Sequence, residues 1–244
     1  MAKLGLVSIS FRNHSPREVL AAAKAAGLSC IEWGSDVHAP VDKAAEIAAL
    51  TKEYGMECCS YGTYFRLGVT PMEELAGYLK AAKTLGTDIV RLWCGNKDSE
   101  KHTLEEKEAL FAQCRQAAQL AQKHGVILCL ECHRNTYTNC QAGAEEVLAA
   151  VNSPHFCMYW QPNHYISEEA NIAYANAISY CVKVIHVFNW KEQTKSPLKE
   201  AVSQWQRYLG CFEVDLPLLL EFMPDNCLDS LGAEADALRE IVNQ

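Results

Sequence analysis

The sequence lacks the features that mark nucleic-acid-binding and membrane proteins. It has no block of lysine or arginine, and its formal net charge is −8, which disfavours a nucleic acid or an anionic membrane as a partner. No apolar run approaches the roughly 20 residues of a membrane span. The first residues enter a predicted strand directly, without the architecture of a signal peptide. We therefore expect a cytoplasmic protein with no nucleic-acid and no membrane partner.

A glycine-rich dinucleotide fingerprint is also missing, because no Gly-x-Gly-x-x-Gly follows the first predicted strand. This counts against the dinucleotide-binding version of a doubly wound sheet. The composition is that of an ordinary globular enzyme, with 49% hydrophobic and 21% charged residues. At 244 residues the chain is long enough for one α/β barrel or for a compact doubly wound domain.

Strand-like and helix-like segments alternate along the whole chain. Glycine follows several of the predicted helices and marks the step into the next strand. Eight such units in about 250 residues predict an α/β fold, a (β/α)8 TIM barrel that forms a single domain over residues 1–244. A doubly wound open sheet is the structural alternative. The predicted strands cover residues 4–9, 29–33, 56–61, 88–93, 126–131, 156–161, 182–188 and 216–222, and the predicted helices cover residues 16–26, 43–54, 71–85, 104–124, 142–151, 167–179, 198–209 and 231–242.

The chain contains twelve cysteines, most of them within predicted apolar strands and helices. In a reducing compartment such cysteines are best interpreted as small buried hydrophobic residues. One local pattern, Cys129-Leu-Glu-Cys132-His133, matches the Cys-x-x-Cys-His signature of c-type haem attachment. Its two thiols lie three residues apart on a predicted strand and therefore point to opposite faces. We interpret the match as a coincidence.

Polar residues stand at or near the ends of six predicted strands. Because the carboxyl ends of all strands in a barrel meet at one mouth, we expect these side chains to converge on one pocket. Buried carboxylates need a compensating cation, and oxygen ligands with one imidazole suit a divalent ion such as Mn²⁺, Mg²⁺ or Co²⁺. A metal-free network of hydrogen bonds around the arginine is the alternative. The six residues are Glu32, Arg91, Glu131, Gln161, His186 and Glu221.

Four of these residues carry a family resemblance through their order and their surroundings. Glu131 follows the fifth predicted strand, and Gln161-Pro-Asn-His164 follows the sixth. His186 lies in Val-Ile-His-Val-Phe-Asn-Trp, and Glu221 lies in Leu-Leu-Leu-Glu-Phe-Met. This arrangement resembles the metal-binding pattern of the xylose-isomerase-like TIM barrel superfamily, the sugar phosphate isomerases and epimerases that include the ketose 3-epimerases. The resemblance covers essentially the whole chain, including Ile31-Glu32-Trp33-Gly34 and Asp36-Val-His38.

The resemblance implies a divalent metal held by Glu131, Gln161, His186 and Glu221, with Mn²⁺ as the first choice and Mg²⁺, Co²⁺ or Zn²⁺ as alternatives. It also implies that Glu131 and Glu221 are the catalytic acid and base. The chain departs from the family at Gln161, where the family usually has aspartate. The loss of one carboxylate should weaken the binding of a divalent ion. Either the metal is held loosely, or the site has moved away from metal.

Together these residues predict a sugar or sugar phosphate isomerase or epimerase. One glutamate removes a proton beside a carbonyl, the metal stabilises the enediolate, and the other glutamate returns the proton. Further side chains near the strand ends are predicted to bind the substrate, although each has a structural alternative in packing, capping or ion pairing. These substrate-binding candidates are Glu32, Trp33, His38, Arg91, His133, His164, Trp190 and Lys191.

Three other functions stay open. An apurinic-site endonuclease of the same superfamily would need a basic surface and more histidines for its zinc ions, and this acidic chain has no such surface. A dehydratase on a keto or cyclic sugar would use the same proton abstraction and then expel hydroxide. A non-catalytic sugar-binding barrel is the third, with Gln161 as the mark of a lost metal. We expect a small-molecule sugar or sugar phosphate as the partner, and a homo-oligomer is left open.

Overall fold

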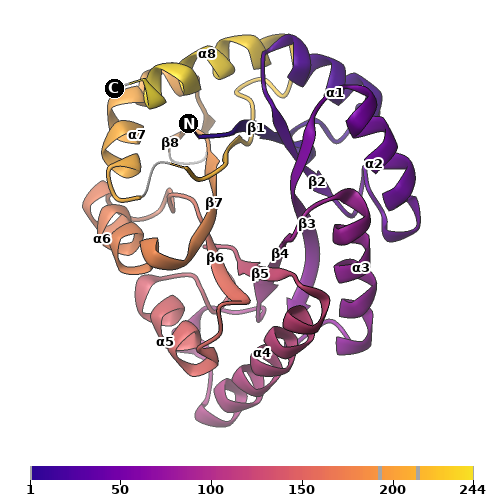
Figure 1. Ribbon diagram of the computed structural model, residues 1–244. Helices are drawn as coiled ribbons and strands as arrows, with labels where there is room; N and C mark the ends of the chain where they lie inside the picture. The colour runs from indigo at the N-terminus through magenta and orange to yellow at the C-terminus, as the bar shows by residue number, and fades with distance from the viewer. Residues whose placement is uncertain (1, 192–193, 213–214, 244) are drawn as a thin grey trace.

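The protein is a closed barrel of parallel strands surrounded by helices (Figure 1). The computed structural model describes residues 2–191, 194–212 and 215–243. Around the barrel the strands follow one another as β1 (Leu4–Val7), β2 (Cys30–Gly34), β3 (Glu57–Leu67), β4 (Ile89–Cys94), β5 (Ile127–Leu130), β6 (Phe156–Trp160), β7 (Val182–Val187) and β10 (Leu218–Leu220). Strand β10 pairs with β1 in parallel, which closes the barrel. The predicted (β/α)8 architecture is confirmed.

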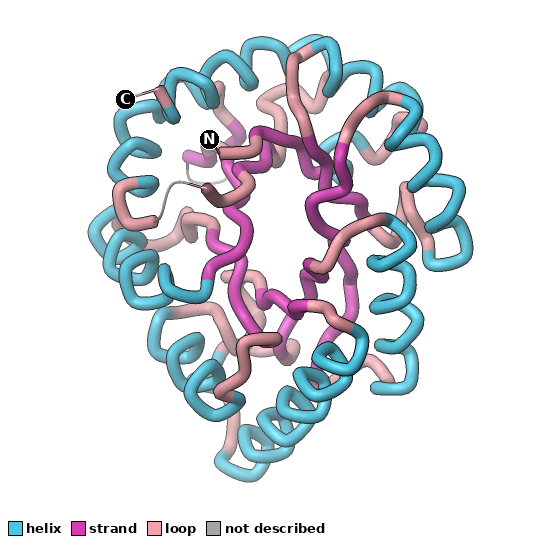
Figure 2. The backbone as a smooth tube through the Cα atoms, viewed as in Figure 1, coloured by secondary structure: helices cyan, strands magenta, loops and turns pink. Residues whose placement is uncertain are grey.

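The helices form an outer layer around the ring of strands (Figure 2). Two predicted helices begin with a short 3-10 turn in the structure. These turns are Met72–Glu74, which precedes α3 (Leu75–Leu85), and Leu198–Ala201, which precedes α7 (Val202–Leu209). In the described part of the chain the α-helices are α1 (Pro16–Ala25), α2 (Ala44–Glu53), α3 (Leu75–Leu85), α4 (Leu104–His124), α5 (Gln141–Val151), α6 (Glu168–Ile178), α7 (Val202–Leu209) and α8 (Leu231–Val242).

Local sequence explains where the best-predicted helices begin and end. Helix α1 begins after Ser15, whose hydroxyl accepts a hydrogen bond from the Glu18 backbone N–H while the Glu18 carboxylate accepts from the Ser15 backbone. Thr103 and Glu106 form the same capping box at the start of α4. Helix α4 ends at Gly125, which has a φ of 62° in the left-handed region that glycine adopts without strain.

Strand β3 is longer than its sequence predicted, because it runs through Gly62 to Leu67 rather than ending at residue 61. The register with β4 shifts between Gly62 and Arg66. Thr63, Tyr64 and Phe65 are strand-forming residues, and the glycine between them and the first half of the strand allows a bulge instead of a stop. The extension carries Tyr64 to the mouth of the barrel.

A small antiparallel pair that the sequence did not predict follows β7. It consists of β8 (Trp190–Lys191) and β9 (Thr194–Lys195). The Asn189 side chain donates to the Pro197 carbonyl at 2.8 Å, which ties the base of this segment together. The pair holds Trp190 over the mouth of the barrel, where it lines a cavity.

The core fills the barrel and the layer between strands and helices. Trp160, for example, packs against Trp205 and Tyr208 with ring centroids 5.9 and 5.2 Å away. Cys129 and Cys132 are fully buried, and burial raises the pKa of the Cys132 thiol to about 12. Inert, buried thiols agree with the interpretation of the haem-like motif as a coincidence. Among the described residues, no helix is long and apolar enough to cross a membrane.

Candidate active site

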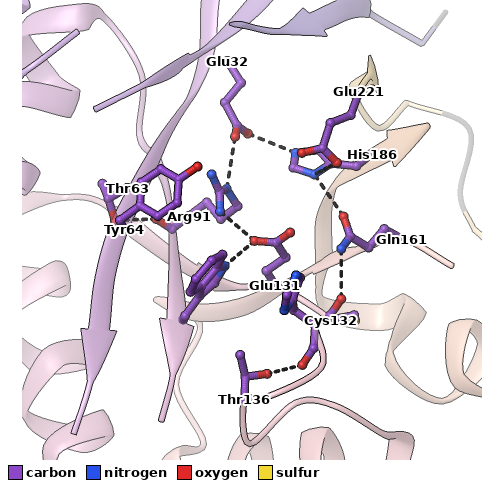
Figure 3. Close-up of polar contacts among 12 residues, drawn as sticks. Glu32, Thr63, Tyr64, Arg91, Glu131, Cys132, Thr136, Gln161, His186 and Glu221 are labelled. Carbon is purple, nitrogen blue, oxygen red and sulfur yellow. Dashed lines mark hydrogen bonds and ion pairs between the residues drawn. The ribbon is translucent and has the colours of Figure 1, made fainter. Parts of the chain in front are cut away.

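The six strand-end residues predicted from the sequence converge at one end of the barrel (Figure 3). All six side chains are buried, with at most 7% of each residue exposed. Parallel strands that end at one face of the barrel bring them together although they are distant in sequence. They are Glu32 in β2, Arg91 in β4, Glu131 after β5, Gln161 after β6, His186 in β7 and Glu221 after β10.

Arg91 is the centre of a buried ionic network. Its Nε donates to Glu32 Oε1 at 3.1 Å, and its Nη1 donates to Glu131 Oε2 at 2.6 Å. Its Nη2 has no hydrogen-bond partner among the described residues. A Cβ at Gly62 would overlap Glu32 and would lie 2.9 Å from Arg91 Nη2, so glycine makes room for the pair. The guanidinium therefore bridges two carboxylates and keeps one NH₂ group uncommitted.

Glu131 is held from two sides by nitrogen donors. Trp93 Nε1 donates to the same Oε2 atom that accepts from Arg91. Burial by itself favours the neutral acid, but the charges of Arg91 and His186 outweigh it and lower the pKa of Glu131. Glu131 is therefore an ionised carboxylate whose one oxygen is fully engaged.

His186 lies between oxygen atoms on both sides of its ring. Its Nε2 is 3.3 Å from Glu32 Oε2, and its Nδ1 is 3.2 Å from Gln161 Oε1 and 3.3 Å from Glu221 Oε2. The Gln161 amide is oriented by its Nε2, which donates to the Cys132 carbonyl at 3.1 Å. Because ionised Glu32 and Glu221 and the Gln161 oxygen are acceptors, a proton on each ring nitrogen satisfies them. Burial opposes the charge, but Glu221 and Glu32 overcome it and raise the pKa of His186 to about 10.

This network should make the free energy of unfolding fall both at acidic pH and at alkaline pH. Burial disfavours the Glu32 carboxylate, yet His186 and Arg91 lower its pKa from 4.5 to about 2. Its contribution is present above pH 4.5 and is lost as the pH falls towards 2. The contribution of His186 is present below pH 6.5 and is lost as the pH rises towards 10. We therefore expect the network to stabilise most between these limits, as urea denaturation across the pH range would measure. A free energy of unfolding that is constant from pH 6.5 to 10 would contradict the His186 assignment.

A cavity of about 220 Å³ opens above the network. Four of the six strand-end residues reach its wall, whereas Glu32 and His186 lie beneath it. Its wall combines charged and amide side chains with aromatic rings, a combination that can bind and orient a small molecule. The lining residues used below are Arg12, Tyr64, Arg91, Trp93, Glu131, His133, Arg134, Gln161, His164, Trp190, Glu221 and Phe222.

Two stacked aromatic pairs form walls of the cavity. Trp93 stacks on His133 with ring centroids 5.1 Å apart, and Trp190 stacks on Phe222 with centroids 5.0 Å apart. Trp190 Nε1 is buried without a hydrogen-bond partner among the described residues. Phe222 has a φ of 62°, which is rare for a bulky residue, and its backbone N–H donates to Ser10 Oγ at 3.1 Å. Flat, rigid faces of this kind suit the C–H surface of a sugar ring.

The structure brings five of the eight predicted substrate-binding residues to the site and places three elsewhere. Trp33 is fully buried, and its Nε1 donates to Thr51 of α2, so it belongs to the outer layer. His38 is held by Ser8 Oγ and the His14 carbonyl, away from the cavity. Lys191 is exposed and pairs with Glu200. These three predictions are corrected. The five at the site are Glu32 beneath the cavity and Arg91, His133, His164 and Trp190 in its wall.

Several residues of the cavity wall were not among the predicted site residues. Tyr64 lies on the extension of β3, which sequence patterning did not predict. Arg12 follows β1 and pairs with Asp36 at 2.6 Å. Arg134 directly follows a predicted residue, His133, and Phe222 directly follows Glu221. Their position just after strand ends is the signal that could have identified them.

The predicted metal ligands are not arranged as a metal centre. Among the described residues, no three His, Cys, Asp or Glu side chains are grouped so that they could hold an ion. Gln161 directs its oxygen to His186 and its nitrogen to a backbone carbonyl. Glu131 is engaged by Arg91 and Trp93. A divalent ion would have to compete with these contacts at Gln161 and Glu131, so in this arrangement the donor set does not fit the metal that the resemblance implies.

The comparisons with known proteins agree with the barrel. Residues 20–238 match the family described as xylose isomerase-like TIM barrel. A comparison with curated proteins finds no match. Solved structures of low sequence identity share the fold. One is the probable 3-DHS dehydratase AsbF involved in petrobactin synthesis from Bacillus anthracis, with a TM-score of 0.79, 18% identity and coverage of 98% of this chain and 99% of that chain.

Two further solved structures are similar over nearly their whole length. The D-allulose 3-epimerase from Methylomonas sp. has a TM-score of 0.75 and 15% identity, over 98% of this chain and 97% of that chain. The IolI protein, whose structure has a zinc atom bound, has a TM-score of 0.79 and 14% identity, over 98% of both chains. These likenesses show a common fold, and the family match covers most of the sequence. The chain therefore belongs to the xylose isomerase-like TIM barrel family.

Proposed function

We propose that this protein is a sugar epimerase or isomerase, which moves a proton at a carbon beside a carbonyl. The observation that carries the proposal is the pairing of two carboxylates, Glu131 and Glu221, in the wall of one cavity beside the buried cation Arg91. Such chemistry needs a base near the carbon, a positive group near the oxygen and a group that returns the proton. All three are supplied by residues of this chain.

Glu221 is the better placed of the two to remove the proton. Its Oε2 is buried and accepts no hydrogen bond among the described residues, although His186 Nδ1 lies 3.3 Å away. Glu131, in contrast, already accepts hydrogen bonds from Arg91 Nη1 and Trp93 Nε1 at its Oε2. In this proposal Glu221 takes the proton from carbon. Glu131, which is ionised in the free enzyme, takes up a proton from a neighbouring substrate hydroxyl or from water, and it can then deliver that proton to the substrate.

The walls of the cavity suit a polyhydroxylated ligand. His133 and His164 provide groups that can bind hydroxyls, and the aromatic side chains of Trp190 and Phe222 line the wall beside them. Solved structures that share this fold include a D-allulose 3-epimerase, an L-ribulose 3-epimerase and a 3-keto-D-glucoside 4-epimerase. These relatives in fold support a ketose or keto sugar as the substrate class. A divalent metal, with Mn²⁺ as the first choice, stays a prediction from the resemblance. The proton transfer proposed here uses protein groups alone.

The proposal predicts exchange of a substrate C–H proton with solvent. D-allulose, L-ribulose, D-tagatose and a 3-keto-D-glucoside would each be incubated with the protein in D₂O and followed by NMR. Deuterium should enter at the carbon beside the carbonyl of at least one of them, together with a second stereoisomer or an isomeric carbonyl. Loss of water from the product would favour a dehydratase instead. Saturable binding of a sugar without exchange would favour a non-catalytic barrel and would contradict the proposal.

A further inference from the structure

We propose that the guanidinium of Arg91 takes the electrostatic role of the divalent metal in this site, so that the enzyme stabilises its oxyanion without a metal ion. The inference rests on the proposed function, because proton removal beside a carbonyl is what would create the oxyanion, an enediolate oxygen. It rests on three features of the site, which are the commitment of the ligand groups, the position of the guanidinium and the space made for it.

The first feature is that two of the four groups expected to bind metal, Glu131 and Gln161, are already engaged by protein groups. Two groups donate hydrogen bonds to Glu131 Oε2, Arg91 Nη1 and Trp93 Nε1. Arg91 Nη1 lies 2.6 Å from this oxygen. The Gln161 amide is fixed at both ends, with its nitrogen on the Cys132 carbonyl at 3.1 Å and its oxygen 3.2 Å from His186. An amide in this orientation offers its oxygen to a ring N–H rather than to an ion.

The second feature is the position of the charge. Arg91 is 2% exposed, lines the cavity together with Glu131 and Glu221, and keeps Nη2 without a partner among the described residues. A buried N–H group without a hydrogen-bond partner destabilises the folded protein, and a bound ligand with an acceptor atom would remove this cost. An enediolate oxygen that approached the guanidinium from the cavity would be such an acceptor, and the hydrogen bond would be charge-assisted. Guanidinium remains charged at every physiological pH, as a metal ion would.

The third feature is that the backbone is built to hold this cation. Gly62 leaves the space that a Cβ would take from Glu32 and Arg91. Ser60 Oγ donates to Glu32 Oε2 at 2.8 Å and so fixes the carboxylate that positions Arg91 Nε. The Thr63 hydroxyl donates to the Arg91 carbonyl at 2.7 Å. Three residues of one strand thus support the guanidinium at its place in the wall.

Glycolohydroxamate, a planar mimic of an enediolate, tests the inference by calorimetry with a chelator present. Wild-type protein should bind it in excess EDTA, and Mn²⁺ alone should show no saturable binding to chelator-stripped wild type. Arg91→Met should bind the hydroxamate about tenfold more weakly or worse, which is the loss of one charge-assisted hydrogen bond. Arg66→Met is the matched control, because Arg66 lies 3.9 Å from the Trp93 ring centroid but outside the cavity wall. Its affinity should be unchanged.

Three results would overturn the inference. These are one-site Mn²⁺ binding by wild type, loss of hydroxamate binding in EDTA, and equal affinities of wild type and Arg91→Met. If Arg91→Met does not fold by circular dichroism, the double variant Glu32→Gln/Arg91→Met, which also removes a partner charge, takes its place. The metal titration does not depend on turnover. Solvent exchange together with Mn²⁺ binding would leave the proposed function standing and remove this inference. Hydroxamate binding in EDTA without solvent exchange by any sugar would remove the proposed function, and only an anion-binding role of Arg91 would remain.

Discussion

Glu221→Gln should lower the rate of solvent-proton exchange into a responsive sugar by about 10²- to 10⁴-fold, the range that a positioned general base contributes. Glutamine keeps the size of the side chain, but its amide cannot accept a proton from carbon. The loss should appear in the turnover number, because the cavity wall that binds the sugar is otherwise unchanged. NMR measurement of deuterium incorporation, with sugar well above its KM, gives this rate directly.

Glu234→Gln provides the matched control for this variant. Glu234 of α8 is also a buried glutamate, but its oxygens accept from the Leu198 backbone N–H, at 3.1 and 3.3 Å, far from the cavity wall. Its exchange rate should equal that of the wild type. Glu131→Gln should also lose activity if the second carboxylate handles a proton. A Glu221→Gln protein that is folded and exchanges at the wild-type rate would remove Glu221 from the mechanism.

The architecture was predictable because its signals are local and repeated. The capping residues Ser15 and Thr103 and the stop at Gly125 act within one turn of each helix, so a single sequence displays them. Apolar runs between helices then define strands buried on both faces. The C-terminal end of β3 was mispredicted because Gly62 has a role that depends on distant residues. It makes room for Glu32 and Arg91, which no local pattern reveals.

The site was predictable as a set of positions but not as a set of contacts. Barrel topology alone brings the ends of β5 and β10 together, so Glu131 and Glu221 could be placed in one wall. Strand parity should have corrected Trp33, because neighbours in a strand face opposite sides and Glu32 points inward. The orientation of the Gln161 amide depends on a carbonyl of the preceding βα segment. Such pairings follow from side-chain packing, which spacing in the sequence does not encode.

Arg91→Met should lower the free energy of unfolding by about 3–5 kcal/mol, the cost of removing one partner from a buried ion pair. Methionine fills similar space without charge, so the loss reports the uncompensated carboxylates of Glu32 and Glu131 rather than a void. Without the guanidinium the pKa of Glu32 should rise from about 2, because Arg91 is one of the charges that lower it. The destabilisation should therefore shrink as the pH falls and Glu32 takes up a proton.

Urea denaturation of wild type and variant at neutral and mildly acidic pH measures both effects. Arg17→Met is the matched surface control, since Arg17 pairs with Glu53 at 2.8 Å while both side chains are more than half exposed, and its stability should change little. Adding Glu32→Gln to Arg91→Met removes one of the unpaired charges and should recover part of the loss, since coupled neighbours are not additive. An Arg91→Met protein as stable as wild type at neutral pH would mean that water or a counter-ion reaches the carboxylates. Arg91 would then not be the cation that the buried glutamates require.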